Sequence, residues 1–326
     1  MATYSGKQFE AYVGIATQNI GSEVVAGTLY KMRMPSVNDI DFSGGVQLED
    51  VERTGQRVLR PTDHIAVRGG GTYSWSFSDY VVENEAMLQL LLQLVTEDTS
   101  PSVSASMTGN QATVAYTEGA ATGEYANIVI SSPDTDKDRL MHSAILQDLT
   151  LSLDPSAHGG RLTASGTFWS GFQPDIDTEA SSANATAVDY TKGFFDCTTQ
   201  TLATNAVYMN KFDITISNPA TRAGFKTVNS NAGEPESYNR GGQISVTGNV
   251  GVKMDDNSVT MVDNFLAGTS TNISIGDGST IDFDIPTAKI SGHELDLGNE
   301  SGAFINLPFL GTADGSGVLV TIIGTT

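Results

Sequence analysis

The sequence is poor in cysteine, which forms disulfides and binds metals, and poor in the basic residues lysine and arginine. Its 326 residues include 1 cysteine, 10 prolines and 17 Lys+Arg against 38 Asp+Glu, so the formal net charge is −21. A single cysteine excludes a disulfide framework and any zinc or iron–sulfur site made of several thiolates. The negative charge argues against groove binding on nucleic acid and adhesion to anionic lipid, because both need a basic surface. We interpret Cys197 as an ordinary half-buried residue.

Long hydrophobic runs are also missing. The most apolar stretch, Met87 to Val95, is about half of the roughly 18 residues that a transmembrane helix needs. The first residues, Met1 to Lys7, carry no apolar segment of the kind found in secretory signals. We therefore predict no membrane partner and synthesis in a cytoplasm. The length allows one large all-β domain or two domains of about 150 residues.

Catalytic and ligand-binding motifs are absent as well. The sequence has no GxSxG, no Walker loop, no GxGxxG after a strand and no His pair at metal-ligand spacing. The segment Asp134 to Asp138 begins like an EF-hand loop but has Arg139 and Ile145 where that loop needs Gly and Glu. A solvated turn is the favoured interpretation, with a weak calcium site as the alternative. We predict no enzyme, and no catalytic, cofactor or metal residues.

What the sequence does contain is alternation of apolar and polar residues with a period of two, which is typical of antiparallel strands with one buried face. The clearest predicted strands are Thr72–Phe77, Ile145–Asp154, Phe212–Ser217, Gln243–Val252 and Thr280–Ile285. Helical spacing occurs only in about Glu83 to Val95 and about Ser258 to Ala267. In the second helix Val259, Val262 and Leu266 form the apolar stripe, Asn257 is the expected N-cap, and Gly268 ends the helix. The pattern predicts an all-β protein with two short helices.

The order of these elements repeats. A strand, a long polar stretch, a Gly-Gly pair, a strand, an acidic turn and a helix occur in the first half and again in the second. The polar stretches are Val37 to Arg68 and Asn218 to Arg240. Residues 181–191 are poor in bulky apolar side chains and read as a linker. We therefore predict a first domain over 1–180, a linker over 181–191 and a second domain over 192–326.

Several segments, taken in order, resemble the major tail tube proteins of long, non-contractile-tailed (siphovirus-type) bacteriophages. The opening Gly6–Gly14, the acidic loop Asp39–Glu52 with Arg53-x-Gly55-x-Arg57 and the closing strands Leu149–Leu153 and Gly160–Gly171 match the family's layout in the first half. The second half carries the more diagnostic strings, which are Gln243–Asn257, Val262–Thr269 and Phe283–Ile290. None is a catalytic motif, and the resemblance covers nearly the whole chain.

The resemblance implies two tandem tail-tube-type β-sandwich or split-barrel domains whose sheets join neighbouring subunits into a continuous barrel. The chain would form stacked rings of a hollow tail tube through which DNA passes into the host. Because two domains per chain would give six from three chains, we favour a trimeric, pseudo-hexameric ring; a hexamer is the alternative if only one half lines the lumen. The implied partners are further copies of the chain, the tape measure protein, the tail terminator and distal tail proteins, and passing DNA without specific binding. The implied location is the virion tail, after assembly in the host cytoplasm.

Two sets of residues follow as candidates. Charged residues of the two polar stretches could set the register between rings, and these are Glu49, Asp50, Glu52, Arg53, Arg57, Arg60, Glu234, Glu236 and Arg240. Acids on the polar sides of strands could line a lumen that repels the phosphate backbone, and these are Asp148, Asp213, Asp255, Asp282 and Asp284. Ordinary solvated loops and scattered surface acids are the alternative interpretations.

Two other classes of protein stay open. One is another self-assembling virion or surface protein, such as a capsid decoration protein. The other is a carbohydrate-active β-sandwich, which should expose an aromatic platform. Trp75 and Trp169 instead sit in strand alternation and read as core.

Overall fold

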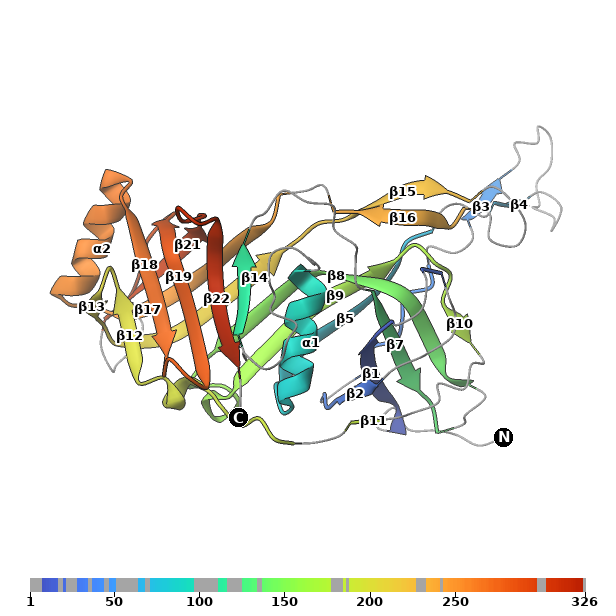
Figure 1. The fold of residues 1–326 in the computed structure, drawn as a ribbon, viewed down its shortest axis with the longest axis horizontal. Helices are drawn as coiled ribbons and strands as arrows, with labels where there is room; N and C mark the ends of the chain where they lie inside the picture. The colour runs from blue at the N-terminus through green and yellow to red at the C-terminus, as the bar shows by residue number, and fades with distance from the viewer. Residues whose placement is uncertain are drawn as a thin grey trace.

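The structure is a computed structural model, and it describes residues 8–16, 20–21, 28–34, 37–43, 47–50, 64–67, 71–96, 111–115, 125–133, 137–176, 184–185, 188–226, 233–240, 243–297 and 303–324. These residues form antiparallel sheets with two helices in an elongated molecule (Figure 1). The prediction of an all-β fold is confirmed. The two helices and the five clearest strands all lie where the sequence placed them, within a few residues at their ends.

One sheet runs along most of the molecule, and we call it the long sheet. Each of its strands pairs antiparallel with the next. In spatial order they are β5 (Tyr73–Val81), β9 (Leu162–Ser170), β8 (Arg139–Leu153), β14 (Met209–Ser217), β17 (Ser245–Lys253), β21 (Phe304–Gly311) and β20 (Glu294–Asp296). The long sheet therefore crosses from the first half of the sequence into the second at β8 and β14.

Two outer layers cover one side of the long sheet, one at each end. The layer of the first half comprises β10 (Asp175–Ile176), the start of β8, β7 (Ala126–Ser131), β1 (Glu10–Ile15), β2 (Leu29–Met32) and β11 (Asn184–Ala185). The layer of the second half comprises β13 (Asn205–Ala206), β12 (Thr199–Leu202), β18 (Ser270–Gly276), β19 (Ile281–Ile290), β22 (Val318–Gly324) and β6 (Gln111–Ala115). β8 and β19 each pair with strands of one outer layer and also with a strand of the long sheet, so each joins its outer layer to the long sheet.

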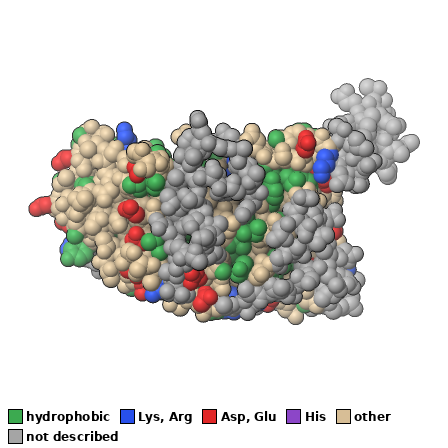
Figure 2. All heavy atoms as spheres, viewed as in Figure 1, with side chains coloured by type: hydrophobic (Ala, Val, Ile, Leu, Met, Phe, Trp, Pro, Cys, Tyr) green, Lys and Arg blue, Asp and Glu red, His purple; other side chains and the backbone are tan. Residues whose placement is uncertain are grey.

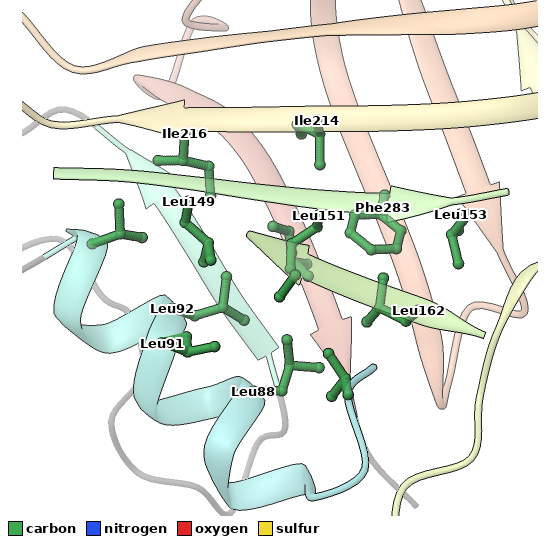
Figure 3. Packing of buried hydrophobic residues seen from close by; sticks show 14 of the residues in the cluster. Leu88, Leu91, Leu92, Leu149, Leu151, Leu153, Leu162, Ile214, Ile216 and Phe283 are labelled. Carbon is green, nitrogen blue, oxygen red and sulfur yellow. The ribbon is translucent and has the colours of Figure 1, made fainter. Parts of the chain in front are cut away.

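The core lies between the layers and follows from the alternation in the sequence. Tyr73, Trp75 and Phe77 point inward from β5 and are buried. Figure 3 shows leucines of α1 facing Leu149, Leu151 and Leu153 of β8, beside Ile214 and Ile216 of β14. The contact between helix and sheet thus includes side chains from both halves of the sequence.

The two helices begin and end at recognisable signals. The first, α1 (Glu85–Thr96), starts where the Asn84 side chain accepts a hydrogen bond from the Met87 backbone N–H. The second, α2 (Asp256–Ala267), starts at Asp255, whose carboxylate accepts from the Ser258 backbone N–H while the Ser258 hydroxyl accepts from the Asp255 N–H. The prediction of Asn257 as N-cap is therefore wrong, because this reciprocal pair satisfies the first turn two residues earlier. Gly268 ends α2 in the left-handed conformation, as expected.

Both long polar stretches contain a hairpin. The hairpin β3 (Gln47–Asp50) and β4 (His64–Val67) lies in the first stretch, and the hairpin β15 (Thr221–Phe225) and β16 (Pro235–Asn239) lies in the second. Both project to the same end of the molecule, at the upper right of Figure 1. Their strands carry few bulky apolar residues, so the alternation pattern predicted no strands in these stretches.

Candidate assembly surfaces

The long sheet has a polar face on the side away from the core, and we call it the polar face. Its side chains stand in cross-strand rows, such as Ser165, Thr150, Thr215 and Thr247 on β9, β8, β14 and β17. The Thr150 and Thr215 hydroxyls are hydrogen-bonded across the β8–β14 boundary at 2.8 Å. This row of small hydroxyl side chains is uncharged, and it continues from Thr247 to exposed Leu310 of β21.

Two of the five predicted lumenal acids lie on the polar face. Asp148 of β8 is exposed and stands opposite Ser217 of β14, and Asp213 of β14 stands opposite Ser152 of β8. Asp213 is half-buried, and its burial raises the pKa of the carboxyl although the ammonium of Lys211 lies 3.7 Å away. The structure therefore brings Asp148 and Asp213 to neighbouring strands of one surface.

The other three predicted lumenal acids lie elsewhere. Asp282 and Asp284 sit on the part of β19 that pairs with β18 and β22 in the outer layer. Burial raises the pKa of each, and the charge of Asp284 adds to the rise at Asp282. Asp255 caps α2. The sequence alone does not tell which strands belong to the long sheet and which to an outer layer, because apolar and polar residues alternate with the same period in both.

The predicted inter-ring residues fall into two groups. Glu49 and Asp50 lie on β3, and Glu52, Arg53, Arg57 and Arg60 lie outside the described residues. On the second hairpin Glu236 is exposed, whereas the carboxylate of Glu234 pairs with Lys226 at 3.7 Å. The two acids on the second hairpin thus differ in how free they are to meet another molecule.

The β15–β16 hairpin is held against the first half of the same chain. The Tyr238 ring packs on Trp169 with centroids 5.0 Å apart, and its hydroxyl accepts a hydrogen bond from the Gly171 backbone N–H. The Lys226 ammonium lies over the Phe172 ring. A hairpin from the second half of the sequence therefore reaches across the β8–β14 boundary and covers Trp169, which is buried at that end of β9.

Arg240 has an internal role that the sequence pattern did not indicate. Its guanidinium donates to the carbonyls of Leu94 and Val95 at the end of α1, to Leu146 of β8 and to Asn218 after β14. The last carbonyls of a helix have no partner within the helix, and a cation there also matches the helix dipole. Burial lowers the pKa of Arg240 to about 9. Arg240 thus ties α1 to the second half of the chain, and its position at the end of a polar stretch made it look like a surface residue.

Further contacts cross the boundary between the halves. β8 and β14 pair over six residues, from Phe212 opposite Leu153 to Ser217 opposite Asp148. β22 pairs with β6, which comes from the first half of the sequence. The Gln89 side chain on α1 donates to the Gly324 carbonyl of β22 at 3.4 Å. We call this set of contacts the internal junction.

The two ends of the long sheet are unpaired edges within the described part of the chain. β20 pairs with β21 on one side only, and it exposes Leu295 by 45% and the following Leu297 by 72%. At the other end, β5 pairs with β9, and its outer side carries a single bridge from Ser74 to Asp41. Unpaired N–H and C=O groups on such edges are templates for pairing with another strand.

The remaining chemical candidates give no site. The Cys197 thiol donates to the Gly193 carbonyl, and burial raises its pKa to about 12, so it is poorly nucleophilic. Asp138 accepts from the Ser132 backbone N–H, while Asp134 and Asp136 lie outside the described residues. Among the described residues no cluster of three His, Cys, Asp or Glu side chains could hold a metal ion. In the same part of the chain, neither helix combines the length and the apolar character that crossing a membrane requires.

The chain matches a known protein family over most of its length. The family model for the phage tail tube protein matches residues 18–311, which is most of the chain. No curated protein matches the chain. The matched range includes both helices, the whole long sheet and the β8–β14 pairing of the internal junction, whereas β22 lies beyond it. The chain therefore belongs to the phage tail tube protein family and is a structural protein of the virion tail.

Proposed function

We propose that the chain assembles into trimeric, pseudo-hexameric rings that stack into the hollow tube through which phage DNA passes. The observation that carries this proposal is the internal junction, where β8 and β14 continue one sheet across the two halves. A sheet that continues between halves of one chain can continue between chains by the same pairing. Affinity would then come from main-chain hydrogen bonds and the apolar faces buried beside them.

The order of strands supports two tube domains, divided as 1–180 and 192–326 with a linker over 181–191. Each half has a hairpin, a long-sheet strand, a helix and three strands that correspond in sequence order, with β6 added in the first half and β20 in the second. The corresponding elements are β3–β4 and β15–β16, β5 and β17, α1 and α2, β7 and β18, β8 and β19, and β9 and β21. The pairings correspond too, since β5 pairs with β9 as β17 pairs with β21.

This correspondence identifies the edges that would meet between chains. β20 follows β19 as the strand that pairs with β21, and it therefore corresponds to the last part of β8, which pairs with β9. The segment 37–43 lies beside β5, as β14 lies beside β17. The internal contact of β8 with β14 therefore predicts an external contact of β20 with segment 37–43 of the next copy. Repeated head to tail, three chains would close a ring of six domains.

The polar face would line the lumen. Its hydroxyl rows carry no basic side chain for phosphate. Asp148 would repel the DNA backbone, and Asp213 would add to this repulsion after the charge of neighbouring Lys211 offsets part of its own. Figure 2 looks at the side of the molecule that carries α1 and the outer layers, and it shows acidic side chains spread over the described surface there, so the negative charge is not confined to the polar face. DNA would thus slide without being held.

Replacing Asp148 by lysine should make assembled tubes retain DNA. Each lysine that meets a phosphate adds a salt-sensitive contact, so we expect retention at low salt to rise on the order of tenfold and to vanish at high salt. Retention of labelled DNA by sedimented tubes measures the effect. Asp256→Lys, on α2 and away from the polar face, is the matched control. Equal retention by the two variants would remove Asp148 from the lumen.

Both hairpins would make the contacts between stacked rings, because they project to one end of the molecule (Figure 1). Exposed Glu236, together with Glu49 and Asp50 of β3, is the part of the predicted set that we retain for this role; Arg240 is engaged inside the chain. The end rings would then meet the tape measure protein and the terminator and distal tail proteins.

Electron microscopy of the purified chain at high concentration tests the proposal, together with mass measurement of isolated rings. Hollow tubes and a ring mass of three chains are the expected result. A ring of six chains would replace the trimer by a hexamer. Flat sheets or shells would favour a capsid decoration protein instead.

A further inference from the structure

α2 has two apolar stripes, and only one of them faces the core. Met261 is fully buried and Phe265 is half-buried against the His293 ring, at 5.8 Å between centroids. Val259 is 42% exposed and Leu266 is 72% exposed. These two residues follow helical spacing and form what we call the outer stripe, whereas half-buried Val262 between them packs against the core. The sequence pattern selected this outer stripe as the buried side of the helix.

α1, the corresponding helix, leaves no such stripe exposed. Seven of its apolar residues are buried, which are Met87, Leu88, Leu90, Leu91, Leu92, Leu94 and Val95. Part of that cover comes from the other half of the chain. Leu88 lies so close to Gly324 of β22 that a side chain at Gly324 would collide with it, and Gln89 donates to the Gly324 carbonyl. The internal junction thus contributes to the burial of α1.

The element that would cover α2 can be identified by the same correspondence. β22 pairs with the start of β19, as β10 pairs with the start of β8. α2 and β10 lie at opposite ends of the long axis in Figure 1, so they cannot meet within one chain but can meet head to tail. β10 exposes Ile176 by 50%, which gives an apolar side chain for the contact.

We propose that the outer stripe of α2 docks on the β10 end of the next copy of this chain, as a helix clamp outside the shared barrel. The inference rests on the proposed head-to-tail ring and adds a second contact to it, independent of β20 pairing. Burying Leu266 and Val259 there removes apolar surface that a lone chain leaves in water.

Cross-linking tests the contact directly. In a Cys197→Ser background, cysteines at Leu266 and Ile176 in one chain should be joined between copies by a short bis-maleimide reagent. The expected product is a ladder that stops at three chains, and each single-cysteine variant should give no ladder. Tubes that form normally but give no 266–176 product with the short reagent would overturn the clamp and leave the ring proposal intact. Failure of the unsubstituted chain to form any ring would instead contradict the proposed function.

A charge substitution provides the second measurement. Leu266→Glu should raise the protein concentration needed for assembly on the order of tenfold, because a carboxylate would be buried at the contact. Thr260→Glu adds the same charge at an exposed position of the same helix and serves as the control. Circular dichroism should show both variants folded, since neither position is buried in the chain. An equal assembly threshold for the two variants would contradict the clamp, and a Leu266→Glu variant that fails to fold leaves the cross-link to decide.

Discussion

Proline in β20 should stop ring assembly while the chain stays folded. Successive N–H groups along a strand point to opposite sides, so of Leu295 and Asp296 one donates toward β21 and the other toward the open edge. Proline at the edge-facing residue removes a donor that only a second chain would use. Losing that bond and leaving its acceptor unpaired costs about 2–4 kcal/mol, which weakens association on the order of a hundredfold. Sedimentation velocity and electron microscopy measure the loss of rings.

The two proline variants are controls for each other. Leu295→Pro and Asp296→Pro should differ in thermal unfolding, because only one of them breaks a bond to β21. The variant with the unchanged unfolding temperature is the one expected to lose assembly. If that variant still forms rings at the original concentration, β20 is not the edge that joins chains.

Replacing Arg240 by methionine should destabilise the chain by about 3–4 kcal/mol. The substitution keeps much of the aliphatic stem but removes the donors to four carbonyls, two of them at the end of α1. Hydrogen bonds from a charged group are worth more than neutral ones, and carbonyls left unpaired inside the protein add their desolvation cost. Urea unfolding of the unassembled chain, followed by circular dichroism, measures the change.

Lys289→Met is the matched control for Arg240, because it removes one positive charge from an exposed position on β19. Its effect should be within about 0.5 kcal/mol. Arg240→Lys should fall between the two, because an ammonium cannot reach carbonyls from three segments as a planar guanidinium does. Equal stability of the methionine variants would show that α1 is held by its leucines alone.

Sequence periodicity predicted the strands and helices well, because one buried face leaves a clear trace. Tyr73, Trp75 and Phe77 were assigned to the core correctly on this basis. The way in which these elements pack against one another leaves no such pattern in the sequence. Nothing in the local pattern separates Asp148 on the long sheet from Asp282 in the outer layer, and nothing marks Arg240 as a partner of α1. The prediction that the outer stripe of α2 faces the core was wrong for a related reason. Apolar spacing shows that a helix surface is suited to burial, but not which molecule buries it.

The strand β6 makes the two kinds of boundary in the proposed ring unequal. β6 lies between α1 and β7 and adds its ladder to β22 at the internal junction. After α2 the chain reaches β18 within three residues, so the boundary between chains has no counterpart of β6. Around the tube, three boundaries within chains, which have the β6 ladder, would alternate with three boundaries between chains, which lack it. Under bending or internal pressure the tube wall would separate first at the boundaries between chains, so the ring would open into three intact chains.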